Sequence, residues 1–415
     1  MRRVVITGLG AVSPIGCDAP SSFKAAVEGR SGVAPITLFD ATGYGCRIAG
    51  ECTGFDPPRH GVRNEVRPTD RLIQLAMNAA DEAVRDAGVE SFDVMMQRRT
   101  GVILGVGTGG PASSARSAAR WLIRSSPRAS WSSQNTASLC NLVPREIALK
   151  HGMRGTRYAI GSACASGAHA VGEAFRSIAA GDLDACLAGG AEAAVTALAV
   201  GALGASGVLT SRNGAPRRAS RPWDQTRDGF VPAEGAGLLF MEEREQAKRR
   251  GARIWAELIG YGASADSYHL AQSAQEGEGA QRAMQAALAD AGVDPRCVDY
   301  LNAHGSSTAV SDVVELDAIR SVFGSHASDG LWVSSTKGAT GNLLGAAGGL
   351  EAVFSVRALY DGVVPPTINL ERPAPEASGI DLVPNAARAR ELSCVLSNSF
   401  GFNGSNASLV FQKHS

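Results

Sequence analysis

The sequence has no excess of either charge and no long apolar run. Lysine and arginine together number 40, as do aspartate and glutamate, so the formal net charge at pH 7 is zero. A chain without a net positive field gives no reason to expect binding to nucleic acid or to an anionic membrane surface. No uninterrupted apolar segment reaches the ~18 residues expected of a membrane-spanning helix. Any acidic partner must therefore meet a local basic patch, and we expect no membrane span.

Paired cysteines are also missing. The eight cysteines are scattered along 415 residues and none forms a Cys-x-x-Cys pair, which argues against a disulfide framework or a zinc site. The apolar run in MRRVVITGLG passes straight into a glycine-rich turn and lacks a signal-peptide core of adequate length. These features predict reduced thiols, no metal, a first β-strand near the N-terminus and a cytoplasmic protein.

What the chain does contain is a regular alternation of short β-branched or apolar runs with alanine-rich helical stretches. This alternation favours an α/β protein in which helices cover a sheet. A second series of similar segments follows the first, and a chain of 415 residues exceeds the usual size of a single core. We therefore predict two similar halves, residues 1–250 and residues 251–415.

Both halves contain a strand that ends in small residues and turns sharply into a helix. In the first half, Cys164 lies at this turn, in GSACASGAHA. At a helix N-terminus the backbone N–H groups and the helix dipole stabilise a thiolate, and small neighbours give an acyl group access to the sulfur. The motif predicts a nucleophile elbow that uses sulfur. A buried structural cysteine explains the local sequence equally well, so context must decide.

Three polar residues surround the corresponding turn of the second half. Lys337 in SSTKGATG and Glu351 in GGLEAV flank it, with Asn342 between them. The lysine and the glutamate form either a buried ion pair that orients a site or a pair of ordinary helix-end charges. Asn342 carries an amide N–H that can polarise a thioester carbonyl, although it cannot exchange a proton near neutral pH.

A histidine and two loops supply further candidate groups. His304 in YLNAHGSST lies at a strand end, where an imidazole can donate to a carbonyl oxygen or accept a proton. His169, five residues after the elbow cysteine, is better explained as a packed histidine. The segment SNSFGFNGSN is either a plain turn or a loop that offers backbone N–H groups to an oxyanion. Residues 201–237 are rich in turn residues and predict a long functional loop or a connection between the halves.

Taken together, these segments resemble the beta-ketoacyl-[acyl-carrier-protein] synthase family, and within it the elongating synthase II enzymes, including ketosynthases of type II polyketide pathways. The resemblance implies a thiolase-like α/β fold with two similar βα halves in a five-layer αβαβα arrangement, usually as a dimer. The matching segments occur in the family's order over residues 1–412 and are VVITGLGAVSPIG, ACASGAHA, LAGGAEAA, SRPWDQTRDGFVPAEGAG, YLNAHGSSTAVSD, SSTKGATGNLLGAAGGLEA, VPPTINL and SNSFGFNGSNASLVF.

The resemblance also implies a reaction and the groups that perform it. Cys164 would take an acyl chain from acyl carrier protein as a thioester, with the backbone N–H groups of Cys164 and Phe402 as oxyanion hole. His304 would stabilise the enolate formed when malonyl-carrier protein loses CO₂, and that enolate would attack the acyl thioester to give a β-ketoacyl product. The enzyme would be an acyltransferase without a cofactor of its own, because its substrates arrive on the phosphopantetheine arm of the carrier protein.

Supporting residues are implied in the same way. Lys337 and Glu351 match the family's supporting charges, Phe402 matches its gating aromatic residue, and Ser306 and Thr308 match hydroxyls that bind the pantetheine arm. A degradative thiolase would need a second catalytic cysteine in the C-terminal glycine loop, which has none. A non-catalytic chain-length partner would lack a nucleophile at the first elbow, where ACASG is intact. Both of these classes are therefore disfavoured.

Three positions depart from the synthase II pattern. Asn342 stands where that pattern has a second histidine, which gives the set Cys164, His304 and Asn342. Two hypotheses remain: an elongating synthase whose Asn342 still donates to the malonyl carbonyl, or a condensation-impaired relative that only transfers or holds acyl chains. Thr108 replaces a bulky pocket residue and the segment SWSSQNTASLCNLVPREIA replaces a more apolar one, which predicts a reshaped pocket for an unusual acyl chain. Asn403 replaces a glycine in the gating loop and is expected to stiffen it.

Docking of an acidic carrier protein needs local cations despite the zero net charge. Arg67, Arg71, Arg124 and Arg128 fall in segments that match the family's docking face, although an exposed arginine is more often only a solubilising charge. A homodimer is the first expectation, with a heterodimer containing a chain-length-factor-like subunit as the alternative. The sequence leaves open which acyl chain is extended and whether the pathway makes fatty acids or a specialised polyketide.

Overall fold

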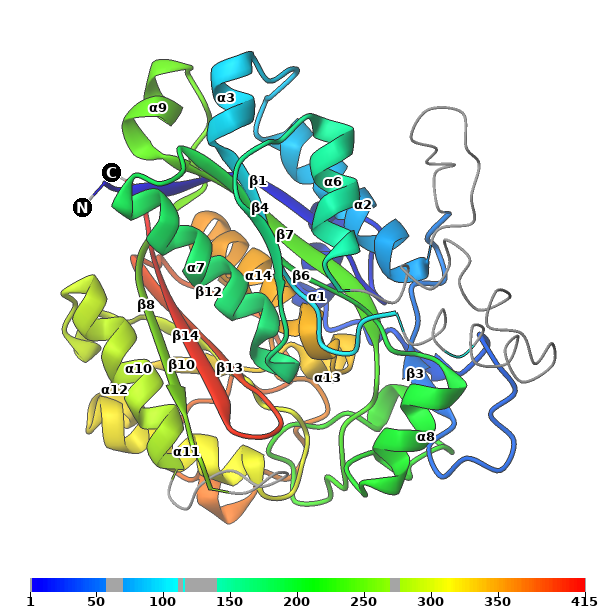
Figure 1. The fold of residues 1–415 in the computed structure, drawn as a ribbon. Helices are drawn as coiled ribbons and strands as arrows, with labels where there is room; N and C mark the ends of the chain where they lie inside the picture. The colour runs from blue at the N-terminus through cyan, green and yellow to red at the C-terminus, as the bar shows by residue number, and fades with distance from the viewer. Residues whose placement is uncertain (1, 57–69, 111–114, 116–139, 269–276, 415) are drawn as a thin grey trace, which may run out of the picture.

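The computed structural model describes residues 2–56, 70–110, 115, 140–268 and 277–414 (Figure 1). Its core is a ten-stranded sheet made of two runs of five strands. Both runs have the same strand order when each is read from its own edge of the sheet to the centre. From the edge inwards, the first run is β5 (Arg157–Ile160), β4 (Thr100–Gly105), β6 (Ala185–Ala193), β7 (Glu234–Glu243) and β1 (Val4–Val12). From the other edge inwards, the second run is β10 (Trp332–Ser334), β9 (Tyr300–Asn302), β13 (Cys394–Phe400), β14 (Ser405–Gln412) and β8 (Ala256–Ala265).

Among the described strands, the two runs join through a short antiparallel pairing between β1 and β8, and they enclose a pair of helices. These central helices, α7 (Ser166–Ala180) and α14 (Ala347–Asp361), contact each other and strands of both runs (Figure 1). The outer faces are covered by α2 (Arg71–Asp86) and α6 (Leu142–His151) on one side and by α10 (Glu278–Ala291) and α11 (Ser311–Phe323) on the other. The order of helix and sheet layers is thus αβαβα, which confirms the predicted thiolase-like fold.

Close packing explains the glycine-rich start of the chain. All nine residues of β1 are buried, as expected of a strand covered on both faces. A Cβ atom at Gly8 would lie 2.0 Å from the carbonyl oxygen of Ala83, and one at Gly10 would lie 1.9 Å from that of Ala79. The glycines therefore let α2 pack directly against the strand.

The sharp strand-to-helix turn does occur twice, as predicted. A 3₁₀ turn at Ala163–Ala165 leads into α7, and one at Leu344–Ala346 leads into α14. Ala163 and Leu344 have φ values of 50° and 47°, a left-handed conformation that side chains other than glycine adopt only where the surroundings impose it. Each position of the second turn lies 181 residues after its counterpart in the first. Gly345 therefore occupies the place of Cys164, and only the first elbow carries a nucleophile.

The turn-rich region 201–237 is an ordered segment of the first half that leads into β7 and bonds to residues of the second half. Asp224, fully buried, accepts hydrogen bonds from the guanidinium of Arg221 at 3.0 Å and from the backbone N–H groups of Glu371 and Arg372 at 3.0 and 2.8 Å. The indole N–H of Trp223 donates to the backbone of α11. Buried carboxylates with this many donors hold a segment in one conformation, so the region positions residues rather than acting as a loose linker.

The remaining elements are short, and one of them, α13 (Lys337–Thr340), is fully buried. No helix in the described ranges has the length and apolar character needed to cross a bilayer. The short remaining helices and strands are α1 (Ala19–Val27), β2 (Val33–Pro35), β3 (Ile48–Gly50), α3 (Val94–Arg99), α8 (Ala197–Ala205), α9 (Arg244–Arg249), α12 (His326–Asp329), α13 (Lys337–Thr340), β11 (Val363–Val364) and β12 (Arg388–Ala389).

Candidate active site

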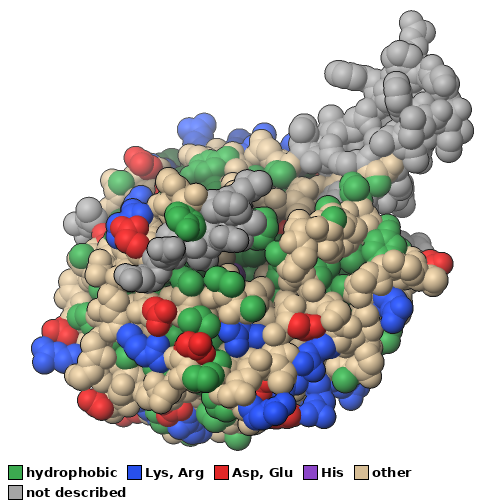
Figure 2. Space-filling model, turned by 90° about the horizontal axis from the view of Figure 1, so that it is seen from below, with side chains coloured by type: hydrophobic (Ala, Val, Ile, Leu, Met, Phe, Trp, Pro, Cys, Tyr) green, Lys and Arg blue, Asp and Glu red, His purple; other side chains and the backbone are tan. Residues whose placement is uncertain are grey.

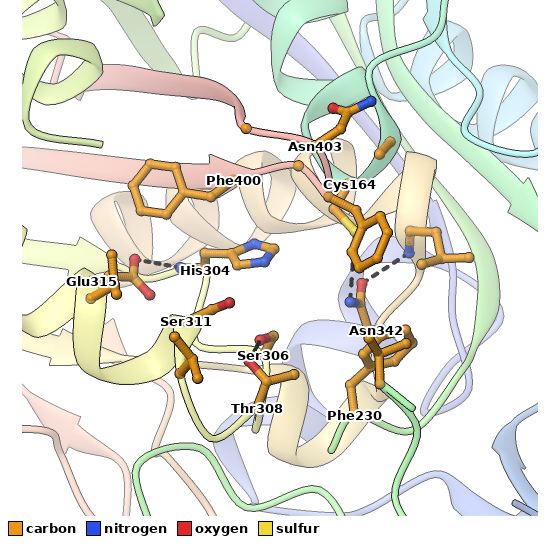
Figure 3. A pocket seen from close by; sticks show the side chains of 18 of the residues that line it. Cys164, Phe230, His304, Ser306, Thr308, Ser311, Glu315, Asn342, Phe400 and Asn403 are labelled. Atoms are coloured by element: carbon orange, nitrogen blue, oxygen red, sulfur yellow. Dashed lines mark hydrogen bonds between the residues drawn. The ribbon is translucent and has the colours of Figure 1, made fainter. Parts of the chain in front are cut away.

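A cavity of about 500 Å³ lies where the two elbows meet. Figure 2 looks onto the face where it opens and shows a hollow near the centre with hydrophobic side chains inside it. Cys164, His304 and Asn342 all line the cavity (Figure 3). They come from the first elbow, the turn after β9 and the turn before α14, so the fold brings the three predicted polar groups together from distant parts of the chain.

Cys164 is buried, with 5% of its surface exposed, at the start of the segment that leads into α7. Burial raises the pKa of its thiol above the usual value, and this outweighs the lowering effects of the Lys337 charge, the Asn342 amide and the backbone N–H of Phe402. Burial therefore opposes the stabilisation of a thiolate that the sequence predicts from the helix N-terminus, and that stabilisation stays a prediction. The sulfur rests as a thiol and must lose its proton when it attacks.

This resting state has a direct chemical signature. We expect alkylation of Cys164 by iodoacetamide to be slow at pH 7 and to rise about tenfold per pH unit to beyond pH 9, because only the thiolate reacts. Peptide mass spectrometry would follow the rate, with the exposed Cys297 as an internal measure of reagent reactivity. A rate that levels off below pH 8 would mean that the thiolate is already formed at neutral pH.

His304 occupies the turn after β9 and is held there by its backbone. Glu315 of α11 accepts the backbone N–H groups of His304 at 2.8 Å and of Gly305 at 2.7 Å. Burial, and then the positive charge of Lys337, keep the pKa of the imidazole well below its usual value. Its Nδ1 atom has no hydrogen-bond partner among the described residues. A neutral, unengaged imidazole facing the cavity is suited to hydrogen bonding with a substrate carbonyl.

Lys337 and Glu351 form a buried ion pair directly behind the histidine. The Lys337 ammonium donates to a carboxylate oxygen of Glu351 and also to the backbone carbonyl of His304, the latter at 2.6 Å. Both side chains are at most 4% exposed. Burial raises the pKa of Glu351 to about 7, against the opposing effect of the lysine charge. Of the two explanations left open by the sequence, the structure shows the buried ion pair, and its role in orienting the site stays a prediction.

Asn342 presents its amide N–H to the nucleophile. Its side-chain oxygen accepts the backbone N–H of Leu344 at 3.0 Å, so its nitrogen is turned the other way, and lies 3.7 Å from the sulfur of Cys164 (Figure 3). The backbone of Asn342 is fixed by hydrogen bonds to Val231 and Ala233. The orientation of the amide is therefore set by the protein before any substrate arrives.

The other predicted residues line the same cavity. Ser306 and Thr308 lie within hydrogen-bonding distance of each other, with their hydroxyl oxygens 2.9 Å apart (Figure 3). Phe402 is 37% exposed at the cavity, while its backbone N–H bonds to the sulfur of Cys164. Asn403 has a left-handed φ of 79°, a conformation in which asparagine is better tolerated than most residues.

Thr108 lies in the cavity wall and is tied to a carboxylate that the sequence did not single out. Glu192, fully buried, accepts the Thr108 hydroxyl and the backbone N–H groups of Gly107, Thr108 and Gly345. It therefore links the wall of the cavity to the second elbow. The only signal for it was one acidic residue inside the apolar run LAGGAEAA; Glu315 was missed in the same way, inside the helical segment VVELDA.

His169 is a packed histidine, as expected from the sequence. Its ring bonds to the hydroxyl of Ser162 at 2.8 Å and packs edge-on against Tyr261.

The predicted docking arginines are only partly described by the structure. Arg71 forms a bidentate ion pair with the buried Glu234, so most of its charge is neutralised within the protein. Arg67, Arg124 and Arg128 lie outside the described residues. The described ranges contain no group of three or more residues arranged to hold a metal ion.

Comparison with known proteins agrees with this site. Two family models match the chain, the N-terminal domain of beta-ketoacyl synthase over residues 1–247 and the C-terminal domain over residues 255–371. The chain belongs to the beta-ketoacyl synthase family, a family of acyltransferases, as its sequence motifs predicted.

Within the family, the chain is similar from end to end to proteins named 3-oxoacyl-[acyl-carrier-protein] synthase 2. It is 43% identical over 413 residues to the one from Vibrio cholerae and 45% identical over 412 residues to the one from Coxiella burnetii, with 99% of both chains covered in each case.

Solved structures of similar proteins include synthases from polyketide pathways. A beta-ketoacyl synthase from Burkholderia phymatum superposes with a TM-score of 0.92 at 34% identity. A type II polyketide ketosynthase, bound to the hexaketide and in complex with its acyl-carrier protein, gives 0.91 at 32% identity, and the ishigamide ketosynthase/chain length factor gives 0.89 at 34% identity. Each of the three is covered completely, as is this chain.

Proposed function

We propose that the protein catalyses decarboxylative Claisen condensation of an acyl chain on Cys164 with malonyl-acyl carrier protein, giving a β-ketoacyl-carrier protein. The observation that carries the proposal is the meeting of Cys164, a neutral His304 and an oriented Asn342 amide in one cavity of about 500 Å³. We assign residues 1–250 as the half that carries the nucleophile and residues 251–415 as the half that polarises the malonyl carbonyl.

In the first stage the enzyme becomes acylated. The sulfur of Cys164 loses its proton and attacks the carbonyl of the acyl-carrier thioester; the new carbon–sulfur bond forms and the carrier thiol leaves with a proton. Negative charge develops on the carbonyl oxygen. The backbone N–H groups of Cys164 and Phe402 are the donors for that oxygen, and donors that are already in place stabilise such charge with little reorganisation.

In the second stage the malonyl thioester carbonyl accepts hydrogen bonds from His304 and Asn342. The bond between the malonyl carboxylate and its α-carbon breaks, CO₂ leaves, and the electron pair becomes an enolate held by the two donors. The α-carbon then attacks the acyl thioester on Cys164, the new carbon–carbon bond forms, and the sulfur leaves and is reprotonated. The product is a β-ketoacyl chain two carbons longer. A neutral histidine suits this step because it donates without competing for the malonyl carboxylate as a cation would.

The decisive test concerns Asn342. We expect the wild type to form an acyl adduct on Cys164, release CO₂ from malonyl-carrier protein and give the extended product, because the amide N–H needs no proton exchange to donate. Intact-protein mass spectrometry and a CO₂ assay would follow these steps. Asn342→His serves as the comparison, with a change in pH dependence expected from the titratable ring. An adduct without CO₂ release, with extension gained only in Asn342→His, would instead support an acyl-transferring protein.

The partners follow from the same chemistry. The enzyme would act in the cytoplasm with acyl carrier protein as donor, and its Lys and Arg side chains on the face where the cavity opens, seen in Figure 2, are suited to an acidic partner. Arg67, Arg71, Arg124 and Arg128 remain the proposed docking residues, with Arg71 the weakest of them because of its ion pair. We propose a homodimer, with a heterodimer as the alternative that the ishigamide structure suggests.

The substrate is proposed to differ from ordinary saturated chains. Thr108 places a hydroxyl and a small methyl group in the cavity wall, anchored by Glu192, where the synthase II pattern has a bulky residue. A smaller side chain leaves more room in the cavity, and its hydroxyl makes the wall more polar. Both changes favour a modified or unsaturated chain from a specialised polyketide pathway over a plain fatty acyl chain.

A further inference from the structure

A second hollow lies on the protein surface, away from the residues of the catalytic cavity. Its volume is about 620 Å³, and the residues that line it share none with the first cavity. The lining comes from the turn after α1, the 3₁₀ turn at Pro216–Arg218, the segment at Ile368 and Asn369, and Asn385. Segments from both halves of the chain therefore build it.

The lining of this hollow is strongly cationic. It includes three arginines, Arg30, Arg217 and Arg218, and no aspartate or glutamate. Arg30 pairs with Glu28 at 2.8 Å and Arg218 with Glu371 at 2.5 Å, but all four of these side chains are more than 40% exposed. Arg217 forms no ion pair with any residue that the structure describes. Exposed ion pairs contribute little to stability, so an anion of higher charge can compete for all three guanidinium groups.

The backbone around the arginines is fixed without a ligand. The side chain of Asn369 donates to the backbone carbonyls of Arg217 and Ser220 at 2.9 and 2.8 Å, and that of Asn385 donates to the carbonyl of Leu370 at 2.7 Å. Asn369 and Asn385 both have positive φ values, 64° and 57°. These hydrogen bonds hold the base of the hollow in one shape, which lowers the entropy lost on binding.

We propose that this hollow is a binding site for the diphosphate group of a small molecule. Guanidinium groups bind phosphate oxygens through paired N–H donors, and three of them around one hollow match the charge of a diphosphate. A volume of about 620 Å³ lies in the range of small-molecule sites, and a concave surface suits a compact ligand better than a folded partner. The proposal does not depend on the function assigned to the catalytic cavity.

The site also has a structural route to the catalytic machinery. The backbone N–H of Gly32, which lines the hollow, donates to the carbonyl of Ala339 in α13 at 2.9 Å. Ile368 packs against Gly338 of the same helix, with no room for a Cβ atom between them. Because α13 begins with Lys337, a ligand in the hollow would lie against Gly32 and Ile368, the two residues that contact this helix.

The test uses the full-length protein and inorganic pyrophosphate as the probe. Isothermal titration at fixed ionic strength should give saturable binding at one site, weakened at least tenfold in Arg217→Gln and in Arg30→Gln. The matched control is Arg296→Gln, another exposed arginine, which pairs with Asp294 elsewhere and should bind as the wild type does. Thermal unfolding of each variant without ligand checks that the fold is intact, and elongation activity should be unchanged.

A comparison with ADP tests which kind of molecule carries the diphosphate, and two outcomes would overturn the proposal. ADP binding more tightly than pyrophosphate would indicate a nucleotide-borne diphosphate, whereas equal binding would indicate recognition of the phosphates alone; both support the site. The proposal is overturned if pyrophosphate shows no saturable binding beyond that of sodium chloride at equal ionic strength. It is equally overturned if Arg217→Gln and Arg30→Gln bind pyrophosphate as tightly as Arg296→Gln does.

Discussion

Replacement of Cys164 by alanine is expected to abolish chain extension while leaving decarboxylation. The thiol is the only group at the first elbow that can hold the acyl chain, and its counterpart in the second elbow is Gly345, so no second nucleophile can take over. Loss of a covalent nucleophile reduces turnover by at least about 10³-fold. Mass spectrometry should find no acyl adduct on the variant, and product analysis should find no β-ketoacyl chain.

The same variant should still release CO₂ from malonyl-carrier protein, because His304 and Asn342 remain in place. His304→Ala provides the complementary result: it should keep the acyl adduct and lose CO₂ release, since only Asn342 is left to polarise the malonyl carbonyl. If Cys164→Ala extended chains, or if His304→Ala decarboxylated at the wild-type rate, the division of labour between the two halves would be wrong. Thermal unfolding distinguishes these effects from misfolding.

Replacement of Lys337 by methionine is expected to cost both stability and activity. The ammonium bonds to the carboxylate of Glu351 and to the backbone of His304, and removing one partner of a buried ion pair costs about 3–5 kcal/mol of unfolding free energy. Without the lysine the carboxyl group loses the effect that lowers its pKa, which is already about 7. Urea unfolding should show the loss of stability, and kcat/KM should fall at least about 100-fold as His304 loses its support.

The pH dependence of this loss has a definite sign. A carboxyl whose folded pKa is raised binds its proton more tightly in the folded state than in the unfolded state, so its contribution to stability falls as pH rises from its unfolded value toward its folded one. Folded Glu351 without Lys337 should titrate above pH 7, and the deficit of the variant should be larger at pH 8 than at pH 6. Equal deficits at the two pH values would show that the carboxyl does not titrate in this range.

A double variant separates structure from catalysis. Lys337→Met combined with Glu351→Leu removes both charges, and replacing a buried ion pair by apolar groups is often neutral for stability. We expect the double variant to regain most of the stability lost by the single one, but not its activity, because His304 still lacks the donor that bonds to its carbonyl. Full recovery of activity would mean that the ion pair has only a structural role.

The sequence predicted the repeated elbow well because its causes are local. Small residues at the strand end, a helix-forming stretch after it and a terminal glycine all lie within one continuous segment, so the turn at Cys164 and its counterpart were both found. The sequence predicted the effect of the helix dipole on the thiol but not the opposing effect of burial, since the dipole is a local property whereas burial depends on the whole fold. Burial dominates the pKa of Cys164, and no pattern around the residue reveals how deeply it is placed.

Long-range partners were beyond the reach of sequence patterns. The partner of Arg71 is Glu234, 163 positions further along the chain, and an arginine expected on a docking face is therefore drawn into the protein. Glu192 and Glu315 were overlooked because an acidic residue in an apolar strand or a helix resembles a surface charge. Only the fold shows that each is fully buried and accepts backbone N–H groups beside the cavity.

The meeting of α7 and α14 between the sheet halves also has an electrostatic consequence. Both helices begin beside the cavity, because each follows one of the two elbows that line it. Each helix N-terminus carries the equivalent of about half a positive charge, so two of them direct a local positive field into one enclosed space. A chain with no net charge can in this way favour the anions that arise during the reaction, the tetrahedral oxyanion and the enolate, without placing a permanent cation where it would bind the malonyl carboxylate too tightly.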